Sequence, residues 1–217
     1  MRNKFYQWLV LPVIIAIASC YPKGAEFAED LDLVYTNYAQ GFDFKTKHTF
    51  AIPDSVIKIT GNVFSDPDGD HKPEFANPAY ATAILNAIKT NMANYGWTLV
   101  NKNSNPDVVL LVSTITTTNL YYYYDWWYWG WYYPGYNPGW GWYYPGYYPP
   151  YVTGYRSGSV FVQMVNNSPH PGQGENVTVL WSCILNGLAE GSTANISGRI
   201  TTGINNGFAQ SPYLKIN

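Results

Sequence analysis

The sequence predicts an α+β domain: a mainly antiparallel sheet with two helices packed on one face and a long aromatic-rich loop inserted between strands. Three observations predict this class. Runs rich in β-branched and aromatic residues recur along the chain, two segments repeat apolar residues at helical spacing, and a Tyr/Trp/Gly/Pro-rich tract interrupts the strands. The expected order is strand, helix, four strands, helix. About 200 residues suit a single domain.

The chain opens with a segment typical of secretion, "MRNKFYQWLVLPVIIAIASC". Arg2 and Lys4 precede an apolar run that is shorter than the roughly 20 residues a spanning helix needs. We therefore expect a signal peptide over residues 1–19. The end of this segment, "IASC", resembles the bacterial lipobox, in which small residues precede a cysteine that becomes diacylated. This resemblance implies that the mature protein begins at Cys20, carries fatty acyl chains such as palmitate there, and is attached to a membrane.

Two alternatives for Cys20 remain: an ordinary thiol after a plain signal peptide, or a disulfide with Cys183. Cys183 lies in the apolar run "TVLWSCIL", where a free cysteine behaves as a small buried hydrophobe. Tyr21 follows Cys20 in place of the aspartate that resembles an inner-membrane retention signal. We therefore expect a lipoprotein of the cell envelope, sorted to the outer membrane and facing the periplasm.

Residues 20–34 read as an acidic tether, and residues 35–217 as a single domain with an insertion over 119–155. The first strand is expected over 41–53, where aromatic and polar residues alternate. On this strand we interpret His48 as a half-buried structural residue.

The most clearly marked helix follows Asn77, which can cap it, and Pro78, which suits its first turn. Gly96 supplies a left-handed residue at its end. Apolar residues between these signals recur at helical spacing: Ile84, Leu85, Ile88, Met92 and Tyr95.

Four further strands are expected over 97–100, 108–118, 157–165 and 176–187, the last two forming a hairpin. In the second of these, the residues that face either side of the sheet are apolar, which indicates a central strand covered on both faces. The final helix is expected near 192–211, with a single apolar stripe and three glycines that each weaken it by about 1 kcal/mol relative to alanine. The stripe is Ile196, Ile200, Ile204 and Phe208, and the glycines are Gly198, Gly203 and Gly207.

Several of these segments together resemble a known family. They are "FDFKTKHTFAIP", "ILNAIKTNMANYGWTLV", "NPDVVLLVS", "VTVLWSCILNG" and the closing helix. Between Tyr35 and Pro212 their order and spacing are similar to bacterial lipoproteins catalogued as domain of unknown function 4136. The resemblance implies a compact α+β envelope domain without an established catalytic activity, in which an aromatic or Gly-rich insertion is common at the position of residues 121–151.

The sequence offers one weak metal candidate, the string "DPDGDHKPEF" with Asp66, Asp68 and Asp70. Carboxylates two residues apart on a turning loop can face one calcium ion. However, His71 and Asn77 occupy the positions where a calcium loop needs glycine and glutamate. We therefore interpret the string as a solvated turn and expect no metal and no cofactor.

Catalytic motifs are not found in the sequence. His48, His71 and His170 have no ligand-pair spacing, and neither a nucleophile elbow nor a phosphate-binding glycine loop occurs. We therefore expect no catalytic residues and no enzyme. The formal net charge of −2 does not suit a nucleic-acid partner.

The aromatic tract from Tyr121 to Tyr151 carries the candidate contact residues Trp126, Trp127, Trp129, Trp131, Trp140 and Trp142. Their rings suit a membrane interface, or stacking on sugars or peptide. Alternatively, the tract is a low-complexity connection ordered only around its Pro-Gly turns.

The function that we expect is a lipid-anchored envelope protein acting as a structural or interaction module. Its partners are the membrane, through the lipid on Cys20, and an envelope polymer or protein. A glycan- or peptidoglycan-binding module is the alternative, and a hydrolase is a remote one.

Overall fold

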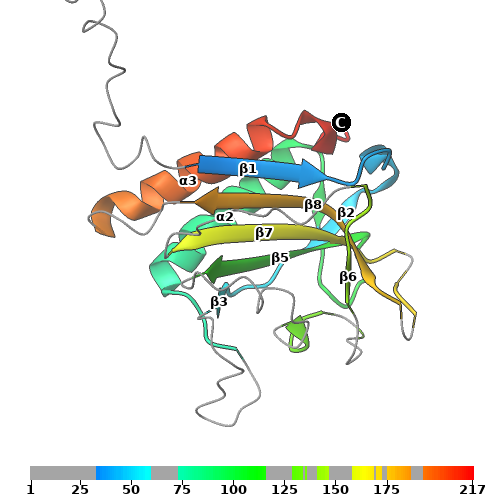
Figure 1. Ribbon diagram of the computed structural model, residues 1–217, viewed down its shortest axis with the longest axis horizontal. Coiled ribbons are helices and arrows are strands. Elements are labelled where there is room, and N and C mark those ends of the chain that lie inside the picture. Colours follow the sequence, from blue (N-terminus) through cyan, green and yellow to red (C-terminus); the bar gives the residue numbers. More distant parts are fainter. Residues whose placement is uncertain are drawn as a thin grey trace, which may run out of the picture. The chain divides into compact units, whose positions relative to one another are not determined.

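The computed structural model describes residues 33–59, 73–115, 129–133, 135, 141–146, 158–168, 170–172, 175–186 and 193–217. Within these residues, two helices lie against a mixed, mostly antiparallel sheet of eight strands (Figure 1). The α+β class is therefore confirmed. The strands are β1 (Leu33–Tyr38), β2 (Thr49–Ala51), β3 (Ile57–Ile59), β4 (Thr98–Leu99), β5 (Val108–Ile115), β6 (Trp142–Tyr143), β7 (Ser159–Asn166) and β8 (Val177–Asn186). The helices are α2 (Pro78–Asn94) and α3 (Thr193–Ala209), with short 3-10 turns η2 (Phe44–Thr46) and η5 (Pro212–Leu214).

The sheet follows the order β1-β8-β7-β5-β2-β4. The long pairs β1–β8, β8–β7 and β7–β5 are antiparallel, whereas the short strands β2 and β3 pair with β5 in parallel. β6 adds a short parallel pair at the start of β8. The predicted hairpin of the two late strands is β7–β8, and it carries an irregularity between Met164 and Val165. β5 is buried along nearly its whole length, as expected for a central strand.

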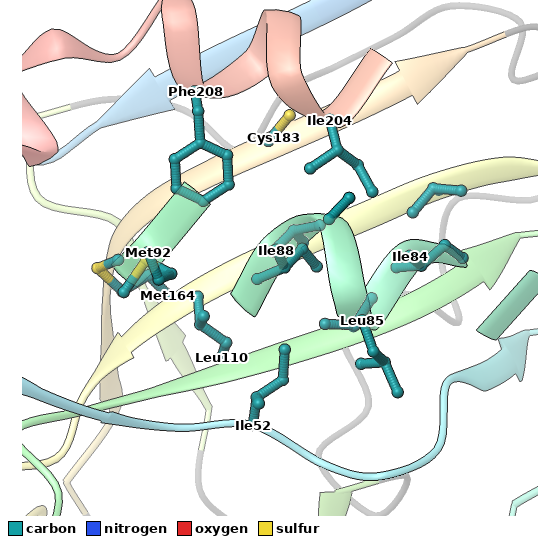
Figure 2. Packing of buried hydrophobic residues seen from close by; sticks show 14 of the residues in the cluster. Ile52, Ile84, Leu85, Ile88, Met92, Leu110, Met164, Cys183, Ile204 and Phe208 are labelled. Carbon is teal, nitrogen blue, oxygen red and sulfur yellow. The ribbon is translucent and has the colours of Figure 1, made fainter. Parts of the chain in front are cut away.

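Helix α2 begins and ends at the predicted signals. The side chain of Asn77 accepts a hydrogen bond from the backbone N–H of Ala79, and Pro78 is the first helical residue. Gly96 has a φ of +94°, the left-handed conformation that glycine adopts without steric cost. The apolar side chains Ile84, Leu85, Ile88 and Met92 are buried against the sheet (Figure 2).

Helix α3 packs the predicted stripe onto the same face, since Ile196, Ile200, Ile204 and Phe208 are all buried. Figure 2 shows Ile204 and Phe208 beside Cys183 of β8. Two glycines explain how the helix approaches so closely. A Cβ atom on Gly203 would lie 2.2 Å from Leu185 Cδ2, and one on Gly207 would lie 2.5 Å from Cys183 Sγ. These residues therefore weaken the isolated helix but permit its contact with β8.

The expected strand over 41–53 is wrong in its first part. Asp43 caps the 3-10 turn η2 by accepting a hydrogen bond from the Lys45 N–H, and only Thr49–Ala51 form a strand. Phe44 is buried in this turn, where it packs near Tyr38 and Tyr213. The alternating aromatic residues here belong to a capped turn that buries the Phe44 ring. The Asp43 side chain hydrogen-bonds to the backbone locally, and this competes with the hydrogen bonds of a sheet.

Three features were not anticipated. His48 is exposed and precedes β2, so its interpretation as a half-buried strand residue is wrong. β1 was not predicted as a strand, and because it begins at Leu33, the sheet includes the last two residues assigned to the tether. β3 and β6 were not predicted at all; with three and two residues, they are too short for a periodic signal.

Candidate functional site

The aromatic tract is the candidate site, and its described residues divide between the interior and the surface. Trp129 is buried, whereas Trp131 and Trp142 are half-buried. The remaining candidates lie outside the described residues: Trp126, Trp127, Trp140, Cys20, Asp66, Asp68 and Asp70. Predictions of lipidation at Cys20 and of a weak metal site in the Asp-rich loop therefore stay predictions.

Three rings, which we call the aromatic root, fasten the tract to the sheet face opposite the helices. They are Trp129, Tyr132 and Tyr133. The N–H groups of Tyr132 and Tyr133 both donate to the Trp129 carbonyl oxygen, at 3.0 and 2.8 Å, which folds the segment into one tight turn. This turn directs the rings into a second hydrophobic cluster, with apolar residues from β3, β5, β7 and β8. Trp129, one of the predicted contact residues, is 3 % exposed and lies within this cluster.

The aromatic root explains why β5 has apolar residues on both of its faces. Val108, Leu110 and Val112 pack under the helices, whereas Val109 and Leu111 pack in the cluster with the root. A sheet with both faces apolar needs a cover on each side. The helices supply one cover and the aromatic root contributes to the other.

Tyr133 is held in place through both its hydroxyl group and its ring. Its hydroxyl donates to the Asn166 carbonyl oxygen at 3.2 Å, and its ring stacks on His170 with centroids 5.8 Å apart. His170 Nδ1 lies 2.9 Å from Asn167 Oδ1, which links the tract to the residues that follow β7. Burial raises the pKa of the Tyr133 hydroxyl well above its usual value, so the phenol stays neutral.

A second piece of the tract docks through β6. Trp142 and Tyr143 pair with Val177 and Thr178 at the start of β8. The next residue, Tyr144, accepts a hydrogen bond through its hydroxyl oxygen from Gln163 Nε2 at 2.9 Å, which satisfies an amide that is otherwise buried in the sheet. Tyr143 points outward and is 54 % exposed.

A third group of rings surrounds the aromatic root on the side of β3. The Trp131 and Phe75 rings meet edge to face with centroids 5.4 Å apart, and Phe75 is 41 % exposed. Lys102 Nζ lies 4.9 Å from the centroid of the Tyr132 ring and 3.4 Å from the Trp131 carbonyl oxygen. Trp131 Nε1 is buried without a hydrogen-bond partner. This group combines partly exposed rings with a nearby cation.

Asp107 is an interaction site that sequence reasoning missed. Its Oδ2 accepts hydrogen bonds from the His48 N–H, the Thr49 N–H and the Thr49 hydroxyl, at 3.0, 2.9 and 2.8 Å. Partial burial raises the pKa of this carboxyl, but these hydrogen bonds and nearby Lys47 outweigh burial, and the net pKa lies below the usual value. Asp107 therefore joins β2 to β5 as a structural contact. Its only sequence signal is its place in the turn before β5.

Cys183 behaves as the sequence predicts for a packing residue. It is a free, buried thiol whose pKa is raised to about 12 by burial. A thiol in this state is neither a ready nucleophile nor a metal ligand.

The described residues contain no group of three or more His, Cys, Asp or Glu side chains arranged to hold a metal ion. As for membrane spans, neither α2 nor α3 combines the length and apolar character needed to cross a bilayer.

Fold and site together define a class: a single α+β sheet domain with helices on one face and docked aromatic residues on the other. The chain belongs to the family described as Domain of unknown function (DUF4136), whose model matches residues 34–213.

Among solved structures, the chain is similar to a DUF4136 family protein from Bacteroides thetaiotaomicron VPI-5482. That match has 34% identity and a TM-score of 0.66, and it covers 86% of this chain and 98% of the other. A second match is a PDZ domain protein from Parabacteroides distasonis ATCC 8503, with 16% identity and a TM-score of 0.43, covering 84% of this chain and 36% of that protein. None of the curated proteins matches this chain.

Proposed function

We propose that this protein is a lipid-anchored protein of the cell envelope that acts by contact rather than by catalysis. In this proposal, a lipid on Cys20 holds the domain at the outer membrane, on the periplasmic side, and the aromatic tract contacts the membrane interface or a partner. The lipobox-like "IASC" sequence supports the anchor.

One observation carries the contact role: the described rings of the tract form an anchored base with partly exposed neighbours. Trp129 and Tyr133 are each 3 % exposed, whereas Tyr143 is 54 % exposed. A passive loop does not need a buried attachment to the sheet. An anchored one holds its outer rings at fixed positions, which reduces the entropy lost when they bind.

The rings also suit the proposed environment. Tyr and Trp combine an apolar body with a polar edge, and both are enriched at membrane interfaces and in protein–protein contacts. Trp142 and Tyr143 are adjacent in β6 and lie at the surface or near it.

The test separates the anchor from the tract. The full chain is expressed in a Gram-negative host, and its membrane association is measured by fractionation and by release with carbonate. Cys20→Ser is expected to leave the protein soluble in the periplasm. If the Cys20→Ser chain still fractionates with the outer membrane, and the wild-type chain releases no acyl chains on hydrolysis, the lipid anchor is rejected.

The contact role is tested on the lipidated protein. Trp142→Ser/Tyr143→Ser is compared with Leu99→Ser, since Leu99 is similarly exposed (49 %) but lies in β4, which β7, β5 and β2 separate from β8, the strand that β6 pairs with. We expect the double variant alone to lose partners recovered by crosslinking in intact envelopes. Equal recovery from both variants would contradict a contact role for β6.

Glycan binding is a second candidate, and the Phe75–Trp131 pair favours it. Partly exposed rings bordered by Lys102 and by the Lys58–Glu74 ion pair, with a 3.2 Å N–O distance, offer apolar and polar contacts side by side. Sugars need both kinds of contact. Muropeptides and polysaccharide fragments are expected to change tryptophan fluorescence of the native protein but not of Phe75→Ala/Trp131→Ala. A flat titration of the native protein across these ligands rejects this candidate.

A further inference from the structure

The two faces of the sheet bury different kinds of side chain. In β5, β7 and β8, which the structure describes throughout, every buried side chain under the helices is apolar. On the opposite face, residues such as Leu111, Phe161 and Ile184 of the second hydrophobic cluster alternate with buried polar residues. These polar residues are Ser113, Ser159, Gln163, Ser182 and Asn186. Burying a polar group costs free energy unless it is hydrogen-bonded, so a cover over this face gains less from burial than the helices do.

Two of these polar residues lie directly opposite each other in neighbouring strands. Gln163 of β7 pairs with Ser182 of β8, and they are 2 % and 1 % exposed. The Tyr144 hydroxyl accepts a hydrogen bond from Gln163 Nε2 at 2.9 Å. Ser182 Oγ, by contrast, has no hydrogen-bond partner among the described residues. Water would satisfy this hydroxyl if the cover opened, and the free energy of the closed state is higher for lack of that bond.

Tyr144 belongs to residues 141–146, which we call the strap. The strap begins beside β8 (Figure 1), where the Val177 N–H donates to the Gly141 carbonyl oxygen at 2.9 Å and β6 pairs with the start of β8. At the other end, a Cβ atom on Gly146 would lie 3.7 Å from Gln40 Cβ, just beyond β1. The strap is therefore placed by contacts with β8, with β7 and with the residue pair after β1.

The helix side of β8 is closed in a different way. Cys183, the neighbour of Ser182 in β8, lies on the opposite face beside Ile204 and Phe208 of α3 (Figure 2). Its surroundings are apolar, and the thiol is fully enclosed. Two adjacent residues of one strand therefore report on two different covers.

We propose that the strap opens as a local unit while α2 and α3 stay docked, and that this opening exposes Ser182 and Gln163 to solvent. Proteins open locally where a segment is held by few apolar contacts, and the polar residues under the strap supply this condition. A ligand then reaches the interior of the domain from the aromatic side of the sheet. The inference stands whether or not β6 contacts a partner or Cys20 carries a lipid.

The test compares two full-length chains, each with a single thiol, that both carry Cys20→Ser. One keeps Cys183, and the other carries Ser182→Cys and Cys183→Ala. Both are treated with iodoacetamide under native conditions, and their urea unfolding is measured in parallel to account for any change in global stability. Exposed thiols react alike, so the rates report how often each face opens. We expect position 182 to react at least about ten times faster than position 183.

A disulfide across the strap tests which segment opens. Gln40→Cys/Gly146→Cys suits one, because the 3.7 Å between the two Cβ positions lies within the about 3.5–4.5 Å that disulfides span. After peptide mapping has confirmed the bond, we expect the reaction at position 182 to slow to the rate at position 183. Gln40→Ser/Gly146→Ser is the matched control, since it also places a side chain at Gly146, where φ is +71°. That control should leave the strap free to open.

The hydroxyl contact of the strap is tested by Tyr144→Phe. Losing the hydrogen bond from Gln163 should raise the rate of reaction at position 182 by about three- to tenfold. Tyr143→Phe is the control, because this neighbouring ring is 54 % exposed and points outward. We expect it to leave the rate unchanged.

Hydrogen exchange gives a readout that leaves Ser182 in place. The disulfide should slow exchange of the Val177 N–H, which donates to Gly141, relative to the serine control.

Three outcomes overturn the proposal. Equal rates at positions 182 and 183 would mean that the strap does not open separately from the helices. An unchanged rate at position 182 in the chain with the disulfide would assign the opening to another segment. Exchange of the Val177 N–H that is unaffected by the disulfide would show that the strap does not detach from β8.

Discussion

Replacing Gly207 of helix α3 by alanine tests how the helix meets the sheet. In an exposed helical position the change would stabilise the protein by about 1 kcal/mol, because alanine is the better helix former. Here the new Cβ would lie 2.5 Å from Cys183 Sγ and 3.6 Å from Val34 Cγ1. The sulfur is fully enclosed and has one short side-chain torsion, so it cannot move away without disturbing the core.

The expected magnitude follows from these two opposing effects. Overpacking a core costs about 1–3 kcal/mol, which cancels or exceeds the gain in helix propensity. We expect Gly207→Ala to lower the free energy of unfolding by up to about 2 kcal/mol. Gly198→Ala is the matched control in the same helix, since the nearest atom to its new Cβ is Asn195 Oδ1 at 3.8 Å. That variant should gain about 1 kcal/mol.

The assay is urea unfolding followed by circular dichroism, with thermal melting as a second measurement. Because 1 kcal/mol corresponds to about 2–4 °C in Tm for a domain of this size, the two variants should differ clearly. Cys183→Ala removes the obstructing sulfur, so Gly207→Ala should cost less in that background than in the wild type. If Gly207→Ala stabilises the protein as much as Gly198→Ala does, the close approach of α3 to β8 is refuted.

Other expected outcomes concern the aromatic root, the partly buried Asp107 and the buried Cys183. Trp129→Ala should lower the free energy of unfolding by about 3–5 kcal/mol, because it leaves a cavity in the second hydrophobic cluster. Tyr143→Ala, at an exposed site, should change the free energy of unfolding by less than about 0.5 kcal/mol. Similar denaturation midpoints for the two variants would contradict a core role for the tract. Asp107→Asn should make stability less dependent on pH in the acid range. The lowered pKa of Asp107 contributes stability above the unfolded-state carboxyl pKa of 3.8, and this contribution is lost as pH falls through the lower folded-state value. If the stabilities of the wild type and the variant fall in parallel below about pH 4, the assigned hydrogen bonds are contradicted. Cys183, with its pKa raised to about 12, should react with a thiol reagent only at the rate of unfolding in a Cys20→Ser chain, and rapid labelling of the native protein would show that the site is open.

The predictable parts of the fold are those with strong local signals. Asn77, Pro78 and Gly96 bound α2 in the structure because each residue satisfies a requirement of a helix end. The stripe from Ile196 to Phe208 identified α3, and the β-branched run from Val108 identified a strand covered on both faces. Local chemistry is enough for these elements because their periodicity is long.

The parts that failed depend on short elements and on distant partners. Asp43 converted an alternating aromatic segment into a capped turn, and Phe44 reaches its neighbours Tyr38 and Tyr213 only in the folded chain. Asp107 gave no motif, because its donors, His48 and Thr49, lie at the start of β2, far from Asp107 in the sequence. No sequence pattern indicates that residues so far apart in the chain are in contact.

The sequence by itself determined the α+β class, the family resemblance, the bounds of α2 and the apolar stripe of α3. It also showed that both faces of β5 need a cover. Only the tertiary structure decided what covers the second face, because Trp129, Tyr132 and Tyr133 are brought to β5 by a turn and by contacts across more than one strand. An aromatic ring has the same apolar area whether it is in a core or on a surface, and the neighbours that distinguish the two are assembled only by folding.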